Sequence, residues 1–584
     1  SNPDCVCVRT THQGPATAAV LGADDAVPSP GAHAAGIMRG PGVLSTHTEV
    51  VIRFADMSMA RTRRNFLGAG LAGASTLAAG CAFNKREAEK APNFLFVIAD
   101  DWSYPHAGAY GDQGVTTPAF DRIAREGVLF THSFCASPSC TPSRSAILSG
   151  RPIYQCGEAG VLYGSIPQDL PLFPLALEDG GYFVGYTGKG WGPGQAEALG
   201  MKRSPTGKAF QSRRHPAGIR AGLDPRDYAA NFADFLEERP EGKPFFFWLG
   251  STERHRVYAP GAGLGIGKKL SDVKMPAQWP DVEAIRSDIL DYYSEVEWLD
   301  RQVAKALDVL EKAGELENTL VVMTSDNGMP FPRAKVNLYD AGTRMPLAIR
   351  WGKRVPDGRV VDDFVSHTDF ASTFLEAAGL PALPGATGKS LMPLLTSTKS
   401  GRIDPEREHV VTALERHTMC RPDGATYPMR ALRSADFLYI RNFEPDRWPT
   451  GGPDFVSSNK RTHGDVDASP TKDFFLDPAN QEKYRTQYEL GFGKRLAEEL
   501  YDVRNDPDQV KNLAGSRAAV ATLSRYRDRL ETILRGEGDP RIEGKDPWQG
   551  YVYRQTTGYG ASLNRSLTLE ERAKAGGAGP HKPE

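Results

Sequence analysis

At roughly 100–200 residues per domain, the 584 residues of the chain are enough for two to four domains. Lys and Arg total 70 and Asp and Glu total 72, so the formal net charge is −2; this balance argues against a nucleic-acid-binding protein or a polybasic membrane protein. Hydrophobic residues make up 40% and charged residues 24%, as in globular chains, and no apolar stretch of about 20 residues predicts a transmembrane helix.

Residues 1–56 show no sign of a folded element. They are rich in Gly, Ala, Pro and Thr and have little apolar periodicity. We expect them to be a leader that is not native or not ordered, with the true start of the protein at Met57 or Met59.

Residues 57–81 have the features of a twin-arginine signal peptide. The pair Arg63-Arg64 precedes a small-residue apolar run from Phe66 to Ala79, which is too short to span a bilayer. The end of the run resembles a bacterial lipoprotein box, in which Cys81 would be lipidated. The prediction is therefore a bacterial lipoprotein, exported by the twin-arginine machinery to the periplasm or cell surface, which contacts the membrane only through its lipid anchor. The alternative is an N-terminal helix of a cytosolic protein.

Residues 91–400 alternate between short apolar runs and helical patterns. The segment Pro118–Glu126, with Thr117 as its cap, and a long amphipathic pattern from Ile285 to Leu310 predict helices. Such alternation implies an α/β domain with a large, mostly parallel sheet covered by helices. The predicted buried parallel strands are Asn93–Ala99, Tyr182–Tyr186, Phe245–Leu249, Leu320–Thr324 and Leu347–Trp351.

The pattern changes after residue 400. His409–Leu414 and Phe437–Arg441 predict strands of a smaller antiparallel sheet, and Ala518–Leu534 predicts a helix that packs on it. We expect residues 401–549 to form this C-terminal α+β subdomain and residues 550–584 to form a loose tail.

Polar residues follow the carboxyl ends of four predicted strands, where open α/β sheets bind their ligands. These groups of residues are Asp100-Asp101, Gly188-Lys189, Thr252–His255 and Ser325-Asp326-Asn327. Three carboxylates brought together without a cation would repel one another. Because the predicted ligands are hard oxygens, the sequence favours Ca²⁺ or Mg²⁺ over zinc.

One of the four cysteines in the body of the chain, Cys140, lies in an informative segment. Pro142 is suited to the first position of a helix that continues through Ser143–Leu148, so Cys140 would lie at a helix N-terminus, where an anion is stabilised. Arg144 adds a cation one turn later. The alternative is a buried free cysteine with no chemical role.

The pattern Cys140-x-Pro142-Ser143-Arg144 resembles the signature of the type I, formylglycine-dependent sulfatase family. The resemblance covers nearly all of residues 91–548. It implies an alkaline-phosphatase-like sandwich and a formylglycine-generating maturation enzyme that oxidises Cys140 to an aldehyde. It also implies a Ca²⁺ ion bound by Asp100, Asp101, Asp326, Asn327 and an oxygen of the modified Cys140.

The same resemblance implies roles for further residues. Arg144 and Lys189 would hold the sulfate, and His255 or Lys335 would protonate the leaving group. Many family members have a His two residues after the matching lysine, whereas this chain has Trp191 there, which we expect to shape the substrate pocket.

The substrate is expected to be a sulfated saccharide. The segments Pro330–Tyr339, Tyr427–Arg430 and Asp546–Trp548 look most like the heparan N-sulfatase (sulfamidase) branch of the family. The expected contacts with an acidic sugar are Arg254, Arg256, Arg333 and His417.

Two other classes of function stay open at this point. A phosphate or phosphonate ester hydrolase of the alkaline phosphatase superfamily would share the sheet and the acidic ligands, but it normally uses Ser or Thr as nucleophile and more histidine ligands. A non-catalytic glycan-binding lipoprotein would be the result if Cys140 stays a thiol. The relative rates of sulfate and phosphate ester turnover, and the chemical state of residue 140, separate these classes.

Overall fold

The computed structural model describes residues 90–253, 255–456, 462–554 and 565–566. The predicted leader, the signal peptide with Cys81, residue Arg254 and most of the predicted tail lie outside the described residues. Within the described part of the chain, no helix is long and apolar enough to cross a membrane.

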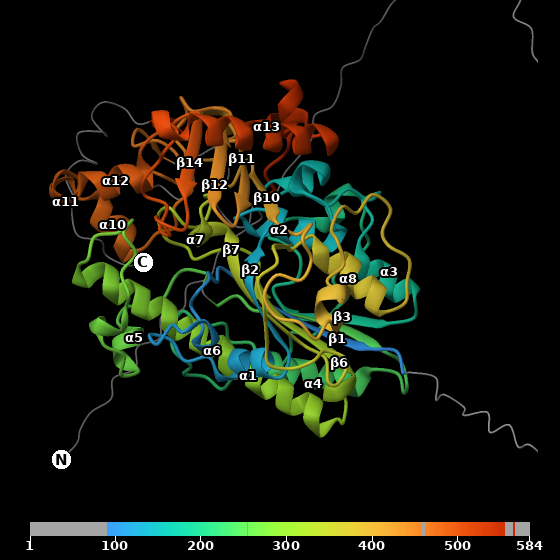
Figure 1. Ribbon diagram of the computed structural model, residues 1–584. Coiled ribbons are helices and arrows are strands. Elements are labelled where there is room, and N and C mark those ends of the chain that lie inside the picture. The colour runs from blue at the N-terminus through green and yellow to red at the C-terminus, as the bar shows by residue number, and fades with distance from the viewer. Residues whose placement is uncertain (1–89, 254, 457–461, 555–564, 567–584) are drawn as a thin grey trace, which may run out of the picture. The chain divides into compact units, whose positions relative to one another are not determined.

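A nine-stranded mixed sheet forms the centre of the structure (Figure 1). Its order is β4-β3-β5-β1-β6-β7-β2-β8, with β9 paired to β2. The strands β3, β5, β1 and β6 are mutually parallel, whereas β7 is antiparallel to both β6 and β2. The strands are β1 Asn93–Ala99, β2 Val128–Phe134, β3 Phe183–Gly188, β4 Lys208–Ala209, β5 Phe245–Gly250, β6 Thr319–Ser325, β7 Arg344–Arg350, β8 Arg359–Val361 and β9 Val365–Ser366.

The prediction of a mostly parallel sheet is confirmed, but the direction of the last predicted strand was wrong. The run Leu347–Trp351 lies largely in β7, which starts at the edge of the sheet where β6 ends. Only the short helix α7 (Asp340–Thr343) lies between β6 and β7. A parallel strand would need a crossover back to the opposite edge, so this connection gives an antiparallel pair.

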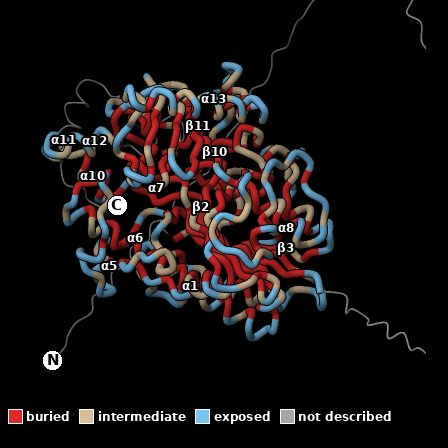
Figure 2. The backbone as a smooth tube through the Cα atoms, viewed as in Figure 1, coloured by how far each residue is buried: buried red, intermediate tan, exposed pale blue. Residues whose placement is uncertain are grey.

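Helices cover both faces of the sheet (Figure 1). Alternate residues of β1 point to opposite sides, so Leu95 and Val97 pack in one core and Phe94 and Phe96 in the other. Figure 2 shows the strands and the inner helix surfaces as buried. The first face carries α1 (Pro118–Arg125), α4 (Tyr228–Glu238) and α6 (Glu283–Lys312), and the second carries α2 (Cys140–Ser149), α3 (Phe173–Asp179) and α8 (Asp369–Ala377).

The predicted cap of α1 differs from the observed one. Thr117 occupies the N-cap position, but its side chain makes no capping hydrogen bond and instead accepts one from the Gly108 N–H. The carboxylate of Asp300, on α6, accepts hydrogen bonds from the Ala119 and Phe120 N–H groups, both at 2.9 Å. An acid from a neighbouring helix therefore satisfies the first turn of α1.

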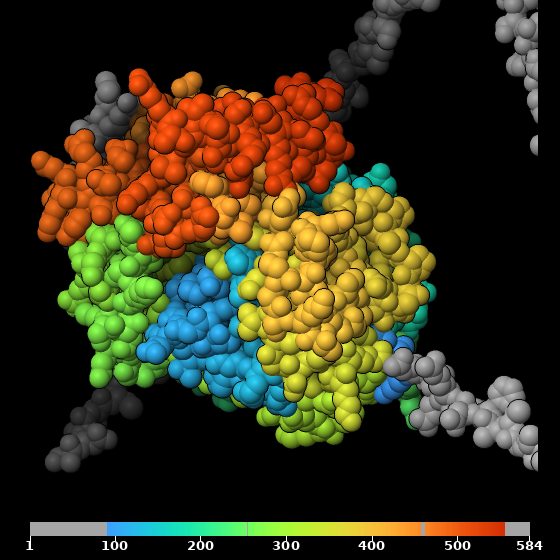
Figure 3. Space-filling model, viewed as in Figure 1, coloured from blue at the N-terminus to red at the C-terminus, as the bar shows by residue number. Residues whose placement is uncertain are grey.

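A four-stranded antiparallel sheet lies beside the larger one, as predicted for the C-terminal part (Figure 1). In Figure 3 the C-terminal residues, coloured orange to red, pack against the rest of the folded chain. It contains β10 (His409–Leu414), β11 (Met429–Ser434), β12 (Phe437–Asn442) and β14 (Glu498–Asp502), and α13 (Val520–Gly536) packs on it. The remaining elements are α5 Ala262–Gly265, α9 Met392–Thr396, α10 Pro470–Leu476, α11 Pro478–Lys483, α12 Arg485–Phe492, and the strand pair β13 Phe455–Val456 and β15 Arg565–Ser566.

Helix α2 lies between the two sheets. Its residues Ile147 and Leu148 pack in the core of the large sheet, whereas Ala146 packs with Ala413 and Leu432 of the small sheet. Every residue of α2 is buried. The helix that carries Cys140 is thus held on both sides.

A buried histidine makes the stability of this fold pH-dependent. His367 is fully buried, and its Nε2 lies 3.2 Å from the Ser133 Oγ and 3.4 Å from the Thr324 Oγ1. Burial lowers its pKa from 6.5 to about 3. Below pH 6.5 the unfolded chain therefore binds a proton that the folded protein does not, so the free energy of unfolding falls as the pH drops from 6.5 towards 3.

We expect the free energy of unfolding of the His367→Gln variant to depend less steeply on pH below 6.5 than that of the wild type. The wild-type free energy of unfolding should fall by about 1.4 kcal/mol more per pH unit than that of the variant, because one proton is involved. Urea unfolding between pH 6.5 and 4 measures the difference, and measurements at pH 7.5 and above serve as the control, because the histidine is neutral there in both states. Parallel curves between pH 6.5 and 4 would contradict the assignment.

Candidate functional site

The acidic residues meet at the carboxyl ends of two paired strands. Ala99 of β1 pairs with Ser325 of β6, so Asp100 and Asp101 lie beside Asp326 and Asn327. The Asp101 N–H donates to the Asp326 Oδ1 at 3.2 Å, and the Asn327 Nδ2 donates to the Asp101 Oδ1 at 2.6 Å. All four side chains are buried. The strand register explains why two distant parts of the sequence form one cluster.

Cys140 is the first residue of α2 and faces this cluster. Its Sγ lies 3.5 Å from the Asp100 Oδ1, and the ligand atoms of Asp100, Cys140 and Asp326 all lie within 4.8 Å of one another. The helix begins at Cys140 rather than at Pro142, which was predicted as its first residue. Proline is tolerated in this first turn because the N–H groups there have no partner within the helix.

Each acid of the cluster has a basic partner. The Arg144 Nε donates to the Asp326 Oδ2 at 2.7 Å, the Lys189 Nζ lies 2.6 Å from the Asp100 Oδ2, and the Lys335 Nζ lies 2.8 Å from the Asp101 Oδ2. Arg144 is also fixed by hydrogen bonds to the backbone oxygens of Lys189, at 3.0 Å, and Gly190, at 2.7 Å. These contacts link the residues that follow β1, β3 and β6 to α2 in one cluster of charged side chains.

The charges act against the effect of burial on the acids. Burial would raise the pKa of Asp100, but Lys189, followed by His255 and Arg144, lowers it below its usual value, so Asp100 is ionised. Burial raises the pKa of Asp101 to about 6, although Lys335 acts in the opposite direction. As the pH falls below about 6, Asp101 is therefore protonated before Asp100.

The thiol of Cys140 is held in its neutral form. Burial, reinforced by the nearby Asp100, raises the pKa of Cys140 well above its usual value. This outweighs the effect of the helix N-terminus, which the sequence predicted to favour an anion there. Since the thiolate is the reactive form of cysteine, an unmodified Cys140 is a poor nucleophile and a poor metal ligand.

The residues of the cluster fit a calcium or magnesium ion. They offer carboxylate and amide oxygens, which are the ligands these ions prefer. The buried Asn327 Oδ1 has no hydrogen-bond partner, so an acceptor beside the acids is left for a cation. The buried Arg144 Nη2, which lies 3.9 Å from the Asp100 Oδ1, makes no hydrogen bond either and leaves a donor for an anion.

A pocket of about 490 Å³ opens beside Asp100. His255 lies on its wall as an exposed side chain, and its Nδ1 is 2.9 Å from the Arg256 backbone oxygen. A carbonyl only accepts, so the Nδ1 carries a hydrogen and the Nε2 is left for substrate. The other residues that line the pocket are Gln211, Arg214, Gly222, Leu223, Asp224, Pro225, Arg226, Thr252, Arg256 and Val257.

Two of the predicted substrate contacts support α2. The Trp191 Nε1 donates to the Ser145 Oγ at 2.9 Å. The His417 Nδ1 lies 2.8 Å from the hydroxyl of Ser139, the residue before Cys140, and burial lowers the pKa of His417 to about 4. His417 is therefore neutral at pH 7 and buried, a state that does not suit binding of an anionic sugar.

Two predicted substrate contacts, Arg256 and Arg333, direct their guanidinium groups to other residues of the protein. Arg256 makes a two-pronged ion pair with Asp288, at 2.7 and 2.9 Å, so we expect it to shape the pocket wall rather than bind an anion. Arg333 is buried, donates to the backbone oxygens of Leu490 and Gln509, and stacks on Tyr339. The structure does not bring Arg333 to Cys140, and Arg254 lies outside the described residues.

Asp467, which no sequence motif predicted, also faces the site. Its Oδ2 lies 3.4 Å from the Lys335 Nζ. Burial would raise its pKa, but Lys335, His255 and His417 lower it, so it is ionised. It lies in a polar loop before α10 with no strand end or motif beside it, so only the fold reveals its position.

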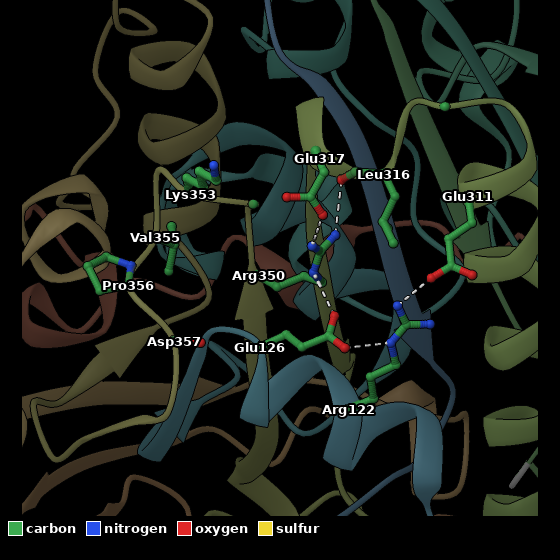
Figure 4. Close-up of a pocket in the computed structure, with 12 residues that line it drawn as sticks. Arg122, Glu126, Glu311, Leu316, Glu317, Arg350, Lys353, Val355, Pro356 and Asp357 are labelled. Carbon is green, nitrogen blue, oxygen red and sulfur yellow. Dashed lines mark hydrogen bonds and ion pairs between the residues drawn. The ribbon is translucent and has the colours of Figure 1, made fainter.

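A larger pocket, of about 750 Å³, lies at the end of the sheet away from Cys140 (Figure 4). Five of its charged side chains pair with one another: Arg122 with Glu126 at 2.8 Å and Glu311 at 2.5 Å, and Arg350 with Glu317 at 2.7 Å. It adjoins the amino end of β6, whereas ligands of such sheets bind at the carboxyl ends. The charge pairing and the position favour the site at Cys140 as the functional one.

Comparisons with known proteins show similarity to sulfatases. Residues 92–380 match the family model described as Sulfatase. Human N-sulphoglucosamine sulphohydrolase is 28% identical over 508 residues, which cover 78% of this chain and 91% of that protein. An ulvan-active sulfatase of Formosa agariphila is 26% identical and covers 73% of this chain and 76% of its own length.

The fold also matches solved structures. A protein solved in complex with its substrate, D-glucosamine-2-N,6-O-disulfate, superimposes with a TM-score of 0.56 at 20% identity, over 78% of this chain and all of that one. The alkaline-phosphatase-like fold class expected from the sequence is thereby confirmed.

Proposed function

Since residues 92–380 form a domain of the sulfatase family, we propose that this sulfuric ester hydrolase acts on a sulfated saccharide through a formylglycine made from Cys140 and a bound Ca²⁺. The observation that carries the proposal is the placement of Cys140 on a buried helix N-terminus, with its Sγ 3.5 Å from the Asp100 Oδ1. The neutral thiol there is unsuited to direct attack, which supports a nucleophile other than the thiol itself.

The chain's own residues fall into three groups in this proposal. Asp100, Asp101, Asp326 and Asn327 would hold the cation with their oxygens. When present, the ion supplies positive charge for the sulfate oxygens, and the hydrated formylglycine supplies a hydroxyl nucleophile and a second hydroxyl that allows sulfate to leave. Human N-sulphoglucosamine sulphohydrolase supports sulfated glucosamine as the substrate class.

The basic residues would stabilise charge and move a proton. The free Nη2 of Arg144 and the ammonium of Lys189 are placed to stabilise charge that develops on the sulfate oxygens. His255 lines the pocket beside Asp100 and, with both ring nitrogens protonated, would donate a proton from its Nε2 to the leaving group. Lys335 would fix Asp101 and Asp467, and Trp191 would hold α2 through Ser145.

We further propose that the folded part is residues 91–549, with 91–400 as the catalytic domain and 401–549 as the C-terminal subdomain. The proposal includes export by the twin-arginine pathway, a lipid anchor at Cys81, and conversion of Cys140 by a maturation enzyme of the host. The related ulvan-active sulfatase and the order of the signal features in residues 57–81 support an exported bacterial enzyme.

An activity screen tests the proposed function. We expect the protein, co-expressed with a formylglycine-generating enzyme, to release sulfate from N-sulfoglucosamine, glucosamine 6-sulfate or their disulfated form. Ion chromatography measures the sulfate, and 4-nitrophenyl phosphate serves as the comparison substrate. Faster turnover of the phosphate ester would favour a phosphohydrolase, and binding of these sugars without any turnover would favour a glycan-binding protein.

A further inference from the structure

A short bridge between two chain segments positions Arg214. Arg214 and Arg226 form an antiparallel β-bridge, and the segments are fixed further by hydrogen bonds from the His215 N–H to the Pro225 oxygen, at 2.8 Å, and from the Asp227 N–H to the Arg213 oxygen, at 3.0 Å. Asp227 is the N-cap residue of α4. The segment is therefore anchored to a helix that covers the main sheet.

The neighbours of Arg214 point away from the pocket. Arg213 makes a two-pronged ion pair with Asp234 of α4, at 2.7 and 2.8 Å, and His215 packs edge-on against Trp298 of α6, with ring centroids 5.2 Å apart. Successive side chains of an extended segment point to opposite sides. Arg214 accordingly lines the pocket that contains Asp100 and His255.

Arg214 differs from the other described arginines of the pocket because no acidic side chain pairs with its guanidinium. The guanidinium of Arg226 is paired with Asp224 at 2.7 and 2.9 Å, and that of Arg256 is paired with Asp288. Arg214 is exposed and has no acidic or hydrogen-bonding partner for its side chain among the described residues. Among the described arginines of this wall, it is the one whose charge is left for a ligand.

We propose that Arg214 binds a second anionic group of the substrate, a sulfate or a carboxylate, while the reacting sulfate lies at Arg144 and Lys189. This inference rests on the proposed function and deepens it. The pocket of about 490 Å³ is of a size that takes ligands larger than a single sulfate group. A planar guanidinium can donate bidentate hydrogen bonds to either anion. The enzyme would therefore prefer a saccharide with two anionic groups.

A matched pair of variants tests the proposal by binding. Arg214→Ala and Arg213→Ala each remove one exposed guanidinium from adjacent positions, but only the first lines the pocket. Both are made in a Cys140→Ala background, so that no substrate is consumed. By isothermal titration calorimetry, we expect Arg214→Ala to weaken binding of glucosamine 2-N,6-O-disulfate or of a monosulfated disaccharide with a uronate about tenfold, and Arg213→Ala less than about twofold.

The two ligands identify the anion. A loss confined to the disulfated sugar assigns a second sulfate to Arg214, and a loss confined to the uronate disaccharide assigns a carboxylate; binding of a monosulfated glucosamine should change in neither variant. Equal affinities of the two variants for every ligand would overturn the proposal. Thermal unfolding midpoints equal to that of the background protein verify that both variants are folded.

The proposed function can fail separately. If the wild-type enzyme releases sulfate from these sugars and the Arg214→Ala variant binds them as tightly as the Arg213→Ala variant, the inference about Arg214 is wrong and the sulfatase activity stands. If the Arg214→Ala effect on binding is observed but the enzyme with residue 140 converted releases no sulfate, the anion site stands and the proposed function fails.

Discussion

Replacement of Cys140 by Ala is expected to lower sulfate release by at least about 10⁴-fold and to leave the protein folded. The reason is that residue 140 lies at the centre of the site, beside Asp100 and Asp326, and supplies the proposed nucleophile. The substitution removes a single sulfur atom, whose described hydrogen bond, to the Asp100 Oδ1 at 3.5 Å, is long, so we expect the fold to tolerate it. Initial rates of sulfate release and the thermal unfolding midpoint measure the two effects.

Two further variants control for this result. Cys156→Ala removes another buried, free cysteine, outside the acidic cluster, and should retain wild-type turnover. Cys140→Ser places a hydroxyl at the site but removes the thiol from which the aldehyde would be made, and should be nearly as slow as Cys140→Ala. Mass spectrometry of the peptide that carries residue 140 should show the aldehyde in active protein. An intact thiol in fully active protein would refute the formylglycine assignment.

The second large effect is expected for Asp326→Asn, which should abolish Ca²⁺ binding and lower turnover at least about 10³-fold. The substitution removes one of the carboxylates that would hold the cation. It also leaves the buried guanidinium of Arg144 without the partner that it contacts at 2.7 Å. Removing one member of a buried ion pair costs about 3–5 kcal/mol of stability, so we also expect a lower free energy of unfolding.

Calcium titration by calorimetry and urea unfolding test this variant. Asp362→Asn is the matched control, because Asp362 directly follows the strand β8 but accepts a hydrogen bond from Thr131, outside the acidic cluster. It should bind Ca²⁺ like the wild type. Unchanged Ca²⁺ affinity in Asp326→Asn would show that the cation, if bound, lies elsewhere.

The core of the site could be predicted because it depends on strand register and on a local motif. Asp100 and Asp326 each follow a short apolar strand, and parallel strands of one sheet end on the same side, so the pattern predicts both acids on that side; the pairing of β1 with β6 then brings them together. Cys140 and Arg144 lie one turn apart on a single helix, so their spacing is fixed locally. The structure places all of them in one cluster.

The rest of the site depends on contacts between distant segments. Arg256 and Arg333 were predicted to bind an acidic sugar because they are cations near the motif, but a sequence does not show that Asp288 and the Leu490 backbone oxygen take their donors. Asp467 reaches the site through the path of a loop that no local pattern specifies. The antiparallel direction of β7 follows from its connection to β6, which apolar composition alone does not reveal.

The position of α2 between the two sheets limits when Cys140 can react with another protein. The side chain is only 2% exposed, and the helix around it is buried against both cores. If Cys140 is converted to formylglycine as proposed, a modifying enzyme would have little access to the thiol in the folded protein, so conversion would take place on the nascent or incompletely folded chain. On that proposal, protein that folds in a cell without such an enzyme would stay inactive even if the enzyme were supplied afterwards.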